Sequence, residues 1–199
     1  MISYLKSLFL TFRQSFDLDQ KKGTILLLGL DNAGKTTFLH RLCTSLTGTT
    51  KAAFAPTEQP TSHQFHADGI TFTGWDLGGQ EAVRHLWTEH TFDADGILFM
   101  VDAGGGKDGG DDGRLGEARD ELDALICGDD GDNLKGVPLA IMLNKCDLDT
   151  ARKSKDVAVG IGYDEVVECH GEENVRMFRM SVTNDKGYQE ALRWIAEFL

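Results

Sequence analysis

Short apolar runs alternate with amphipathic stretches along this chain, and that alternation is typical of an α/β domain with a largely parallel sheet. The apolar runs have the length and the branched or aromatic residues of buried strands. They are Thr24–Leu28, Ile70–Trp75, Ile97–Val101, Leu139–Leu143 and Arg176–Met180. The more polar Gln64–Ala67 precedes the turn Asp68-Gly69, so we predict an edge strand paired with Ile70–Trp75.

Apolar side chains at helical spacing predict three helices, which are Lys35–Leu46, Arg114–Ile126 and Tyr188–Leu199. Weaker helical patterns occupy Ala82–Thr91 and Asp164–Cys169. The chain has 199 residues, 41% of them hydrophobic, which suits one domain with a short appendage.

The first sixteen residues, MISYLKSLFLTFRQSF, form a separate amphipathic pattern. Large apolar side chains recur three and four residues apart, as one stripe along a helix. They are Ile2, Leu5, Phe9, Phe12 and Phe16. The segment is too short to span a bilayer, and its longest strongly apolar run, residues 8–10, is too short for a cleaved signal peptide. Two interpretations stay open here: a helix docked on its own domain, or a helix that lies on a membrane.

Charge and cysteine usage narrow the classes of partner and site. The net charge is −12 and the pI is near 4.8, which argues against nucleic acid because binding its phosphates needs concentrated lysine and arginine. Four cysteines (Cys43, Cys127, Cys146 and Cys169) are scattered without a C-x-x-C pair. We therefore expect neither a zinc site nor a disulfide framework, and a reduced cytosolic compartment.

Residues 103–113 read AGGGKDGGDDG, with six glycines and three aspartates. Such a composition buries little apolar surface, so we expect a mobile, solvated loop. A Ca²⁺ site is the alternative, but the spacing and terminal glutamate of an EF-hand are missing.

Gly29–Thr36 fits the motif G-x-x-x-x-G-K-[ST] between a predicted strand and a predicted helix, the context that this phosphate-binding loop (P-loop) requires. Its backbone N–H groups are expected to converge on phosphate oxygens at the helix N-terminus. Lys35 would reach the β- and γ-phosphates, and the Thr36 hydroxyl would bind Mg²⁺. The other predicted phosphate-binding residues are Asp31, Asn32, Ala33, Gly34 and Thr37.

The segment WDLGGQ follows a predicted strand, which places Asp76 at the carboxyl edge of the sheet near the metal. Gly79 offers a backbone N–H to a γ-phosphate without a Cβ in the way. Gln80 is then the predicted catalytic residue, because it would orient the attacking water.

The segment NKCD follows the predicted strand Leu139–Leu143 and favours GTP over ATP. The Asp147 carboxylate can accept two hydrogen bonds from guanine N1–H and the 2-amino group, a donor pair that adenine lacks. Asn144 would tie the loops together, and the stem of Lys145 would cover the base. These residues disfavour an ATP-dependent kinase.

A threonine between the P-loop and WDLGGQ is expected to give Mg²⁺ a second hydroxyl ligand. Thr57 and Thr61 both follow a proline in APTEQPTS. Their spacing alone does not separate them.

GLDNAGKTT, WDLGGQ and NKCD together resemble the Sar/Arf branch of small GTPases, and the resemblance extends from about Gly23 to Leu199. APTEQPTS and the ending GYQEALRWIAEFL are similar to Sar proteins in particular. The resemblance implies a three-layer P-loop NTPase G domain over residues 20–199, with a six-stranded, mostly parallel sheet flanked by helices. It also implies an amphipathic membrane-binding helix over residues 1–19, tucked away with GDP and released by GTP.

The resemblance implies roles for further residues. In Sar proteins the first Pro-Thr of the doubled pattern carries the magnesium-binding threonine, which favours Thr57. Ser181 and Val182 lie where the family's last base-contacting loop lies, with the Val182 N–H as a candidate donor to the guanine oxygen. Gln80 and Trp75 are Arf-like instead, because typical Sar proteins have histidine after D-L-G-G.

The function that the resemblance implies is a GTPase switch that recruits a COPII-like coat for transport from the endoplasmic reticulum (ER) to the Golgi. Its partners would be GTP or GDP with Mg²⁺, an exchange factor, a GTPase-activating coat subunit and a membrane surface. The protein would be cytoplasmic, and peripheral on ER or Golgi membranes in the GTP state. Ile2 replaces the glycine that N-myristoylation needs.

We expect slow intrinsic hydrolysis, because no arginine is obviously placed as an internal finger. Arg84 is the nearest candidate, and we expect it to face solvent or a partner. An Arf-like GTPase and a GTP-binding scaffold that hydrolyses nothing remain the alternatives.

Overall fold

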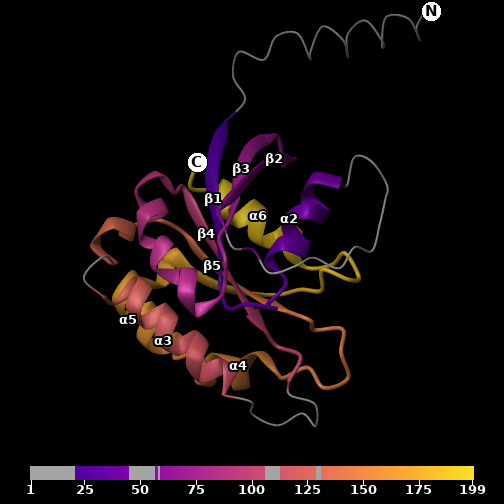
Figure 1. The fold of residues 1–199 in the computed structure, drawn as a ribbon, viewed down its shortest axis with the longest axis vertical. Coiled ribbons are helices and arrows are strands. Elements are labelled where there is room, and N and C mark those ends of the chain that lie inside the picture. The colour runs from indigo at the N-terminus through magenta and orange to yellow at the C-terminus, as the bar shows by residue number, and fades with distance from the viewer. Residues whose placement is uncertain (1–20, 45–56, 58, 106–112, 129–130) are drawn as a thin grey trace, which may run out of the picture.

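The computed structural model describes residues 21–44, 57, 59–105, 113–128 and 131–199 (Figure 1). The predicted helix over residues 1–19, with its apolar stripe Ile2, Leu5, Phe9, Phe12 and Phe16, lies outside these ranges. So does most of the Gly/Asp-rich loop. Among the described residues, no helix combines the length and the hydrophobicity that crossing a bilayer requires.

Six strands form one sheet in the order β2-β3-β1-β4-β5-β6. The strands are β1 (Lys22–Leu28), β2 (Thr61–Ala67), β3 (Ile70–Asp76), β4 (Gly96–Asp102), β5 (Leu139–Asn144) and β6 (Val175–Arg179). β2 pairs antiparallel with β3 at the edge, and the other neighbours are parallel. All six predicted strands are present, most of them longer than predicted by one to three residues.

Strand β1 shows why the sheet is buried on both faces. Ile25 and Leu27 belong to one hydrophobic cluster, Leu26 and Leu28 to the other, and all four are fully buried. Each such burial contributes roughly 1.5–3 kcal/mol, and successive side chains point to opposite faces of a strand. A continuous apolar run is therefore what a central parallel strand needs.

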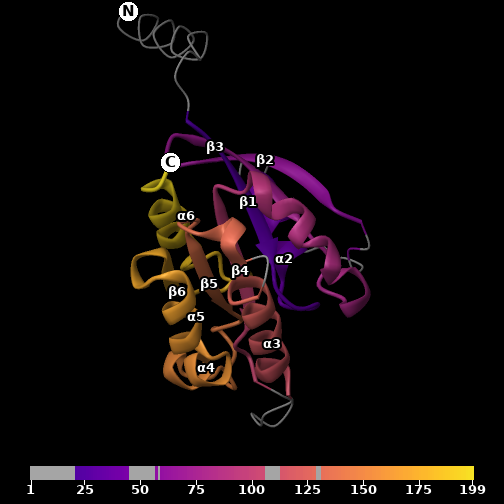
Figure 2. The ribbon, with the colours of Figure 1, turned by 90° about the vertical axis from the view of Figure 1, so that its left-hand side faces the viewer.

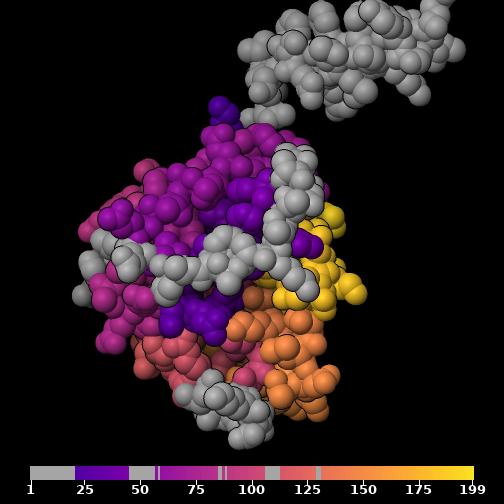
Figure 3. Space-filling view, turned by 45° about the vertical axis from the view of Figure 1, so that its right-hand side comes forward, coloured from indigo at the N-terminus to yellow at the C-terminus, as the bar shows by residue number. Residues whose placement is uncertain are grey.

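Helices cover both faces, giving the predicted three layers (Figures 1 and 2). α2 (Lys35–Thr44) and α6 (Tyr188–Ala196) pack on one face, and α3 (Arg114–Ile126), α4 (Ser154–Gly160) and α5 (Tyr163–His170) on the other. Phe38 of α2 meets Tyr188 of α6 edge to face, with ring centroids 5.3 Å apart. Figure 3 shows α2, in indigo, adjoining the yellow C-terminal segment on this side of the surface.

Four short 3₁₀ helices complete the described elements: η1 (Glu81–Leu86), η2 (Thr88–Asp93), η3 (Gly131–Leu134) and η4 (Glu172–Asn174). The helix predicted over Ala82–Thr91 is thus two 3₁₀ helices that meet at Trp87. The helix α4 was not predicted, because Val157 is the one side chain that this short helix buries.

The expectation of unpaired cysteines is wrong for one pair. Cys127 follows the last residue of α3, Cys169 lies in the last turn of α5, and the two form a disulfide with their Cα atoms 5.6 Å apart. The two helices pack side by side, so residues separated by 42 positions in sequence meet in space. Spacing along the chain does not reveal such a pair.

Candidate functional site

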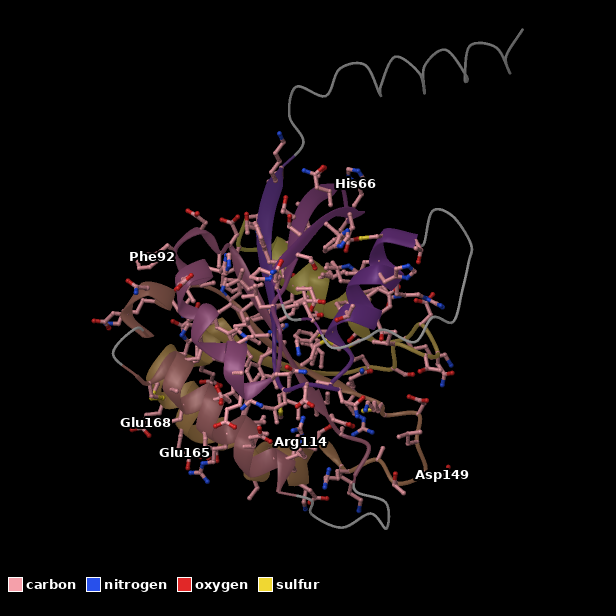
Figure 4. The ribbon with its side chains drawn as sticks, in the orientation of Figure 1. His66, Phe92, Arg114, Asp149, Glu165 and Glu168 are labelled. Carbon is pink, nitrogen blue, oxygen red and sulfur yellow. A yellow bond between two sulfur atoms is a disulfide. The ribbon has the colours of Figure 1, made fainter. Side chains whose placement is uncertain are left out.

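The predicted site residues gather at one edge of the sheet, because parallel strands bring their carboxyl ends together. The P-loop follows β1, Asp76 ends β3, Asp102 ends β4 and Asn144 ends β5. Figure 4 labels Arg114 at the start of α3 and Asp149 on the loop after β5, both at this edge. Residues from the ends of four strands thus share one place.

The P-loop glycines occupy positions that other residues would strain. Gly29 has φ +122° and lies against the Met100 carbonyl, where a Cβ would overlap the backbone. Gly34 has φ +103°, and a Cβ there would lie 2.5 Å from Asn144 Nδ2. The loop can therefore turn tightly into α2, whose first N–H groups have no carbonyl of the preceding turn and are available to an anion.

Lys35 closes over the P-loop. Its ammonium group donates to the carbonyls of Gly29 at 2.7 Å and Leu30 at 2.8 Å, and the residue is 5% exposed. Burial lowers the pKa of Lys35 to about 8, against an opposing effect of the Asp76 and Asp31 carboxylates. A phosphate group would supply the negative charge that this buried ammonium lacks.

Three oxygens converge beside Lys35. The Thr36 hydroxyl lies 2.6 Å and the Thr57 hydroxyl 3.0 Å from Asp76 Oδ2, and the two hydroxyls are 2.9 Å apart. Asp76 is 1% exposed, and its Oδ1 is buried without a hydrogen-bond partner. A hollow of about 280 Å³ lined by Thr36, Thr61 and Asp76 adjoins them.

This arrangement suits a magnesium ion. Mg²⁺ takes oxygen ligands and keeps several waters, for which the hollow leaves room. The Thr57 hydroxyl hydrogen-bonds to Thr36 and Asp76, whereas Thr61 lies opposite Asp76 in β2 with its side chain exposed. The geometry thus favours Thr57, as the resemblance did.

Gly78 and Gly79 pack closely against neighbouring segments, Gly78 against Thr57 and Gly79 against the P-loop. A Cβ on Gly78 would overlap the Thr57 carbonyl, and one on Gly79 would overlap the backbone of Leu30 and Asp31. Gln80 follows, half-buried, as the residue that precedes η1. Gly79 therefore contacts the P-loop directly, and its carbonyl accepts the Asp31 N–H at 3.0 Å.

Asn144 ties two loops together. Its amide donates to the Ala33 carbonyl at 2.8 Å, and its Oδ1 accepts the Val182 N–H at 3.1 Å. The predicted guanine contact of the Val182 N–H is therefore not preformed, because Asn144 already engages that donor. Ser181 is buried beside it and accepts the Asn184 N–H at 3.0 Å.

Two further residues of the NKCD segment, Lys145 and Asp147, differ in exposure. Lys145 is half-buried, has φ +63°, and pairs with Asp102 at 2.6 Å. The Asp147 side chain is exposed at the same edge. The structure thus brings Asp147 to the rim of the site without committing its carboxylate to the fold.

The expectation that Arg84 faces solvent or a partner is wrong. Its side chain is 7% exposed and pairs with Glu117 at 2.6 Å and Glu121 at 2.7 Å, both on α3. The motifs gave no sign of these acids, because they lie more than thirty residues away on a helix with no motif of its own. Arg114, which binds Asp31 at 2.8 Å, was missed for the same reason.

Comparison with known proteins shows the family. Residues 9–199 match the ADP-ribosylation factor family. The Giardia intestinalis protein described as small COPII coat GTPase SAR1 is 36% identical over 189 residues, covering 92% of each chain. ADP-ribosylation factor-like protein 1 of Caenorhabditis elegans is 30% identical over 199 residues, covering 100% of this chain and 96% of its own.

A solved structure shows the same fold. The Arl6 (BBS3) small GTPase of Trypanosoma brucei, determined with the nucleotide analogue GppNp bound, superposes with a TM-score of 0.72 at 23% identity. The match covers 89% of this chain and 96% of that one, which confirms the predicted fold class. With a P-loop, a buried Asp76 and the N-K-x-D segment at one sheet edge, this chain belongs to the ADP-ribosylation factor family of small GTPases, the GTP hydrolases of the Sar/Arf branch.

Proposed function

We propose that this GTPase is a Sar-type switch that recruits a COPII-like coat to the ER membrane for ER-to-Golgi transport. The observation that carries the proposal is the 36% identity to the Giardia SAR1 protein across 92% of both chains. The 30% identity to an Arf-like protein favours, as the second candidate, an Arf-like GTPase of membrane traffic.

In this proposal the P-loop binds the nucleotide phosphates through the backbone of Asp31–Lys35, through Thr37 and through the Lys35 ammonium, with Gly79 facing the γ-phosphate. The Asp31 N–H, which donates to the Gly79 carbonyl at 3.0 Å in this structure, would turn to the phosphate when nucleotide binds. Thr36, Thr57 and Asp76 hold Mg²⁺, which neutralises phosphate charge. The converging oxygens and the unpartnered Asp76 Oδ1 support this assignment.

Guanine is held between the NKCD segment and the Ser181-Val182 loop. Asp147 accepts the two guanine donors, and Lys145 covers the base while pairing with Asp102. Asn144 keeps the two loops in register through its bonds to Ala33 and Val182. In this proposal GTP is recognised by the exposed Asp147 carboxylate, and the Asn144 amide holds the two surrounding loops together.

Gln80 orients the water that attacks the γ-phosphate in line. Most of the catalysis comes from positioning the water and the phosphate and from stabilising the charge of the transition state. The test is single-turnover phosphate release from GTP-loaded protein. We expect slow release alone and faster release with an activating partner, and Gln80→Leu should bind GTP normally while losing the acceleration. Unchanged assisted turnover in Gln80→Leu would remove Gln80 from the mechanism.

Residues 1–19 act in this proposal as the membrane helix, with the stripe Ile2, Leu5, Phe9, Phe12 and Phe16 immersed in the interface. Five such side chains give a gross gain of about 8–15 kcal/mol if fully buried, and partial immersion reduces it. Lys6 and Arg13 add about 1 kcal/mol each on anionic lipid. Attachment is then reversible, on the cytoplasmic surface of ER or Golgi membranes.

The coat assignment is tested by recruitment. Liposomes carrying the GTP-loaded protein should bind purified COPII coat subunits, while GDP-loaded protein should bind none, and an exchange factor should speed loading. Membrane-bound, GTP-loaded protein that leaves COPII subunits in solution would refute the Sar-type assignment and favour the Arf-like alternative.

A further inference from the structure

The Arg84 guanidinium is bound on three sides within the described part of the chain. Its Nε donates to the Gly79 carbonyl at 2.9 Å, its Nη1 to Glu121 Oε1 at 2.7 Å and its Nη2 to Glu117 Oε1 at 2.6 Å. The side chain is 7% exposed. A buried cation held by two carboxylates and a carbonyl is fixed in place, because losing any one acceptor leaves charge unpaired.

The acceptor that Arg84 shares with the P-loop lies directly before Gln80. The Gly79 carbonyl also accepts the Asp31 N–H at 3.0 Å, and the Gly78 carbonyl accepts the buried Trp87 indole N–H at 2.9 Å. Both peptides that lead into Gln80 are therefore held by buried side chains from η1 and the η1–η2 junction. These bonds join the backbone before Gln80 to η1, Trp87 and the P-loop.

Glu117 extends the arrangement to the P-loop. Its second oxygen accepts from Arg114 Nη1 at 3.0 Å, and Arg114 Nη2 donates to the Asp31 carbonyl at 2.6 Å and to Asp31 Oδ1 at 2.8 Å. Asp31 in turn bonds the Gly79 carbonyl. The P-loop, α3 and the segment before Gln80 thus form one closed ring of hydrogen bonds, in which every bond except the backbone one from Asp31 to Gly79 involves an arginine.

We propose that Arg84 is a positioning residue for GTP hydrolysis, which fixes the Gly79 carbonyl and thereby Gln80, with Glu117 and Glu121 of α3 holding its guanidinium. The inference rests on the proposed role of Gln80. Arg84 acts through Gly79 and not on the phosphate, because its three donor groups are engaged with protein acceptors. The planar fork of arginine suits this geometry, which a lysine ammonium reproduces only in part.

The test measures single-turnover hydrolysis and nucleotide dissociation separately, on full-length protein preloaded with GTP. Arg84→Lys keeps the charge and should slow hydrolysis about 10-fold, the scale of one lost charged hydrogen bond, while GTP dissociation changes less than about 2-fold. Glu121→Gln, which weakens the hold on the Arg84 guanidinium, should also slow hydrolysis. The matched control is Arg119→Lys, also on α3, whose pair with Glu165 is exposed; it should hydrolyse like the wild type.

A double variant separates positioning from general loosening. If Arg84 acts through Gln80, adding Arg84→Lys to Gln80→Leu should slow hydrolysis no further. If the two substitutions slow hydrolysis multiplicatively in the double variant, the inference is overturned and the proposed function is not. The same holds if Arg84→Lys hydrolyses GTP at the wild-type rate while Gln80→Leu is slow. A wild-type protein without turnover would overturn the proposed function and the inference with it.

Discussion

Asp147 lies exposed on the loop after β5, three residues beyond the buried Asn144 that braces the site. The two residues belong to one motif but have different roles. Asn144 joins the P-loop to the Val182 loop, and in the proposed function the exposed Asp147 carboxylate binds the base. A change at Asp147 should therefore alter nucleotide choice without altering the fold.

We expect Asp147→Asn to weaken GTP binding about 100-fold or more, because two charged hydrogen bonds are lost. Xanthine carries a carbonyl where guanine carries its 2-amino group, so the new amide can donate to it, and XTP should bind this variant better than GTP. Competition with a fluorescent nucleotide measures both. Asp149→Asn, an exposed acid two residues on, is the control, and equal GTP affinity in both variants would refute the role of Asp147.

The metal assignment separates two threonines that the sequence leaves equivalent. Thr57→Ala should raise the Mg²⁺ concentration needed to slow GTP dissociation, because one ligand is lost, and Thr61→Ala should not. Chelation of Mg²⁺ should speed dissociation from the wild type about 10-fold or more. A Mg²⁺ requirement raised by Thr61→Ala and not by Thr57→Ala would reverse the assignment.

The residues that sequence reasoning found lie within short motifs whose chemistry is local, such as Lys35 in the P-loop and Asp76 before the two glycines. Those that it missed or misplaced depend on packing between distant segments. Arg84 is buried because α3 brings Glu117 and Glu121 against η1, and Val182 is engaged because Asn144 reaches across from β5.

At the scale of elements, hydrophobic pattern located every strand, since central parallel strands are continuous apolar runs. Helices were found where several turns bury one face, as in α3, which begins and ends as predicted. Short helices were either not predicted or were predicted as another type of helix. α4 buries Val157 alone, and the segment after Gln80 forms two 3₁₀ helices because Arg84 and Trp87 turn inward to the glycine carbonyls.

The disulfide between the ends of α3 and α5 should stabilise the domain. Cross-linking residues 42 apart removes unfolded-state entropy worth about 4 kcal/mol in the chain-entropy model, and measured values are typically about 2–4 kcal/mol. Both cysteines are exposed, so Cys127→Ser opens no cavity. We expect reductant to lower the unfolding free energy of the wild type and to leave Cys127→Ser unchanged.

Thiol titration of the denatured, unreduced protein supplies the control. Two reactive thiols, Cys43 and Cys146, are expected. Four thiols, or a wild-type denaturation midpoint indifferent to reductant, would contradict the cross-link.

At the scale of the whole molecule, the sheet order and the placement of every motif at one edge follow from parallel β-α-β connections, which the alternating pattern predicted. The proposed nucleotide site is built from residues between positions 29 and 182, outside the first nineteen. Those residues lie outside the described ranges, so their stripe of Ile2, Leu5, Phe9, Phe12 and Phe16 remains a prediction from spacing.

In the proposed function, the bound nucleotide governs membrane attachment through residues 1–19. Liposome flotation of GTP-loaded and GDP-loaded protein, with and without residues 1–16, tests it most directly. The full chain should float with GTP and stay in solution with GDP, and the shortened chain should float with neither. Flotation that ignores the nucleotide would contradict the switch, and no flotation in any state would contradict the lipid contact.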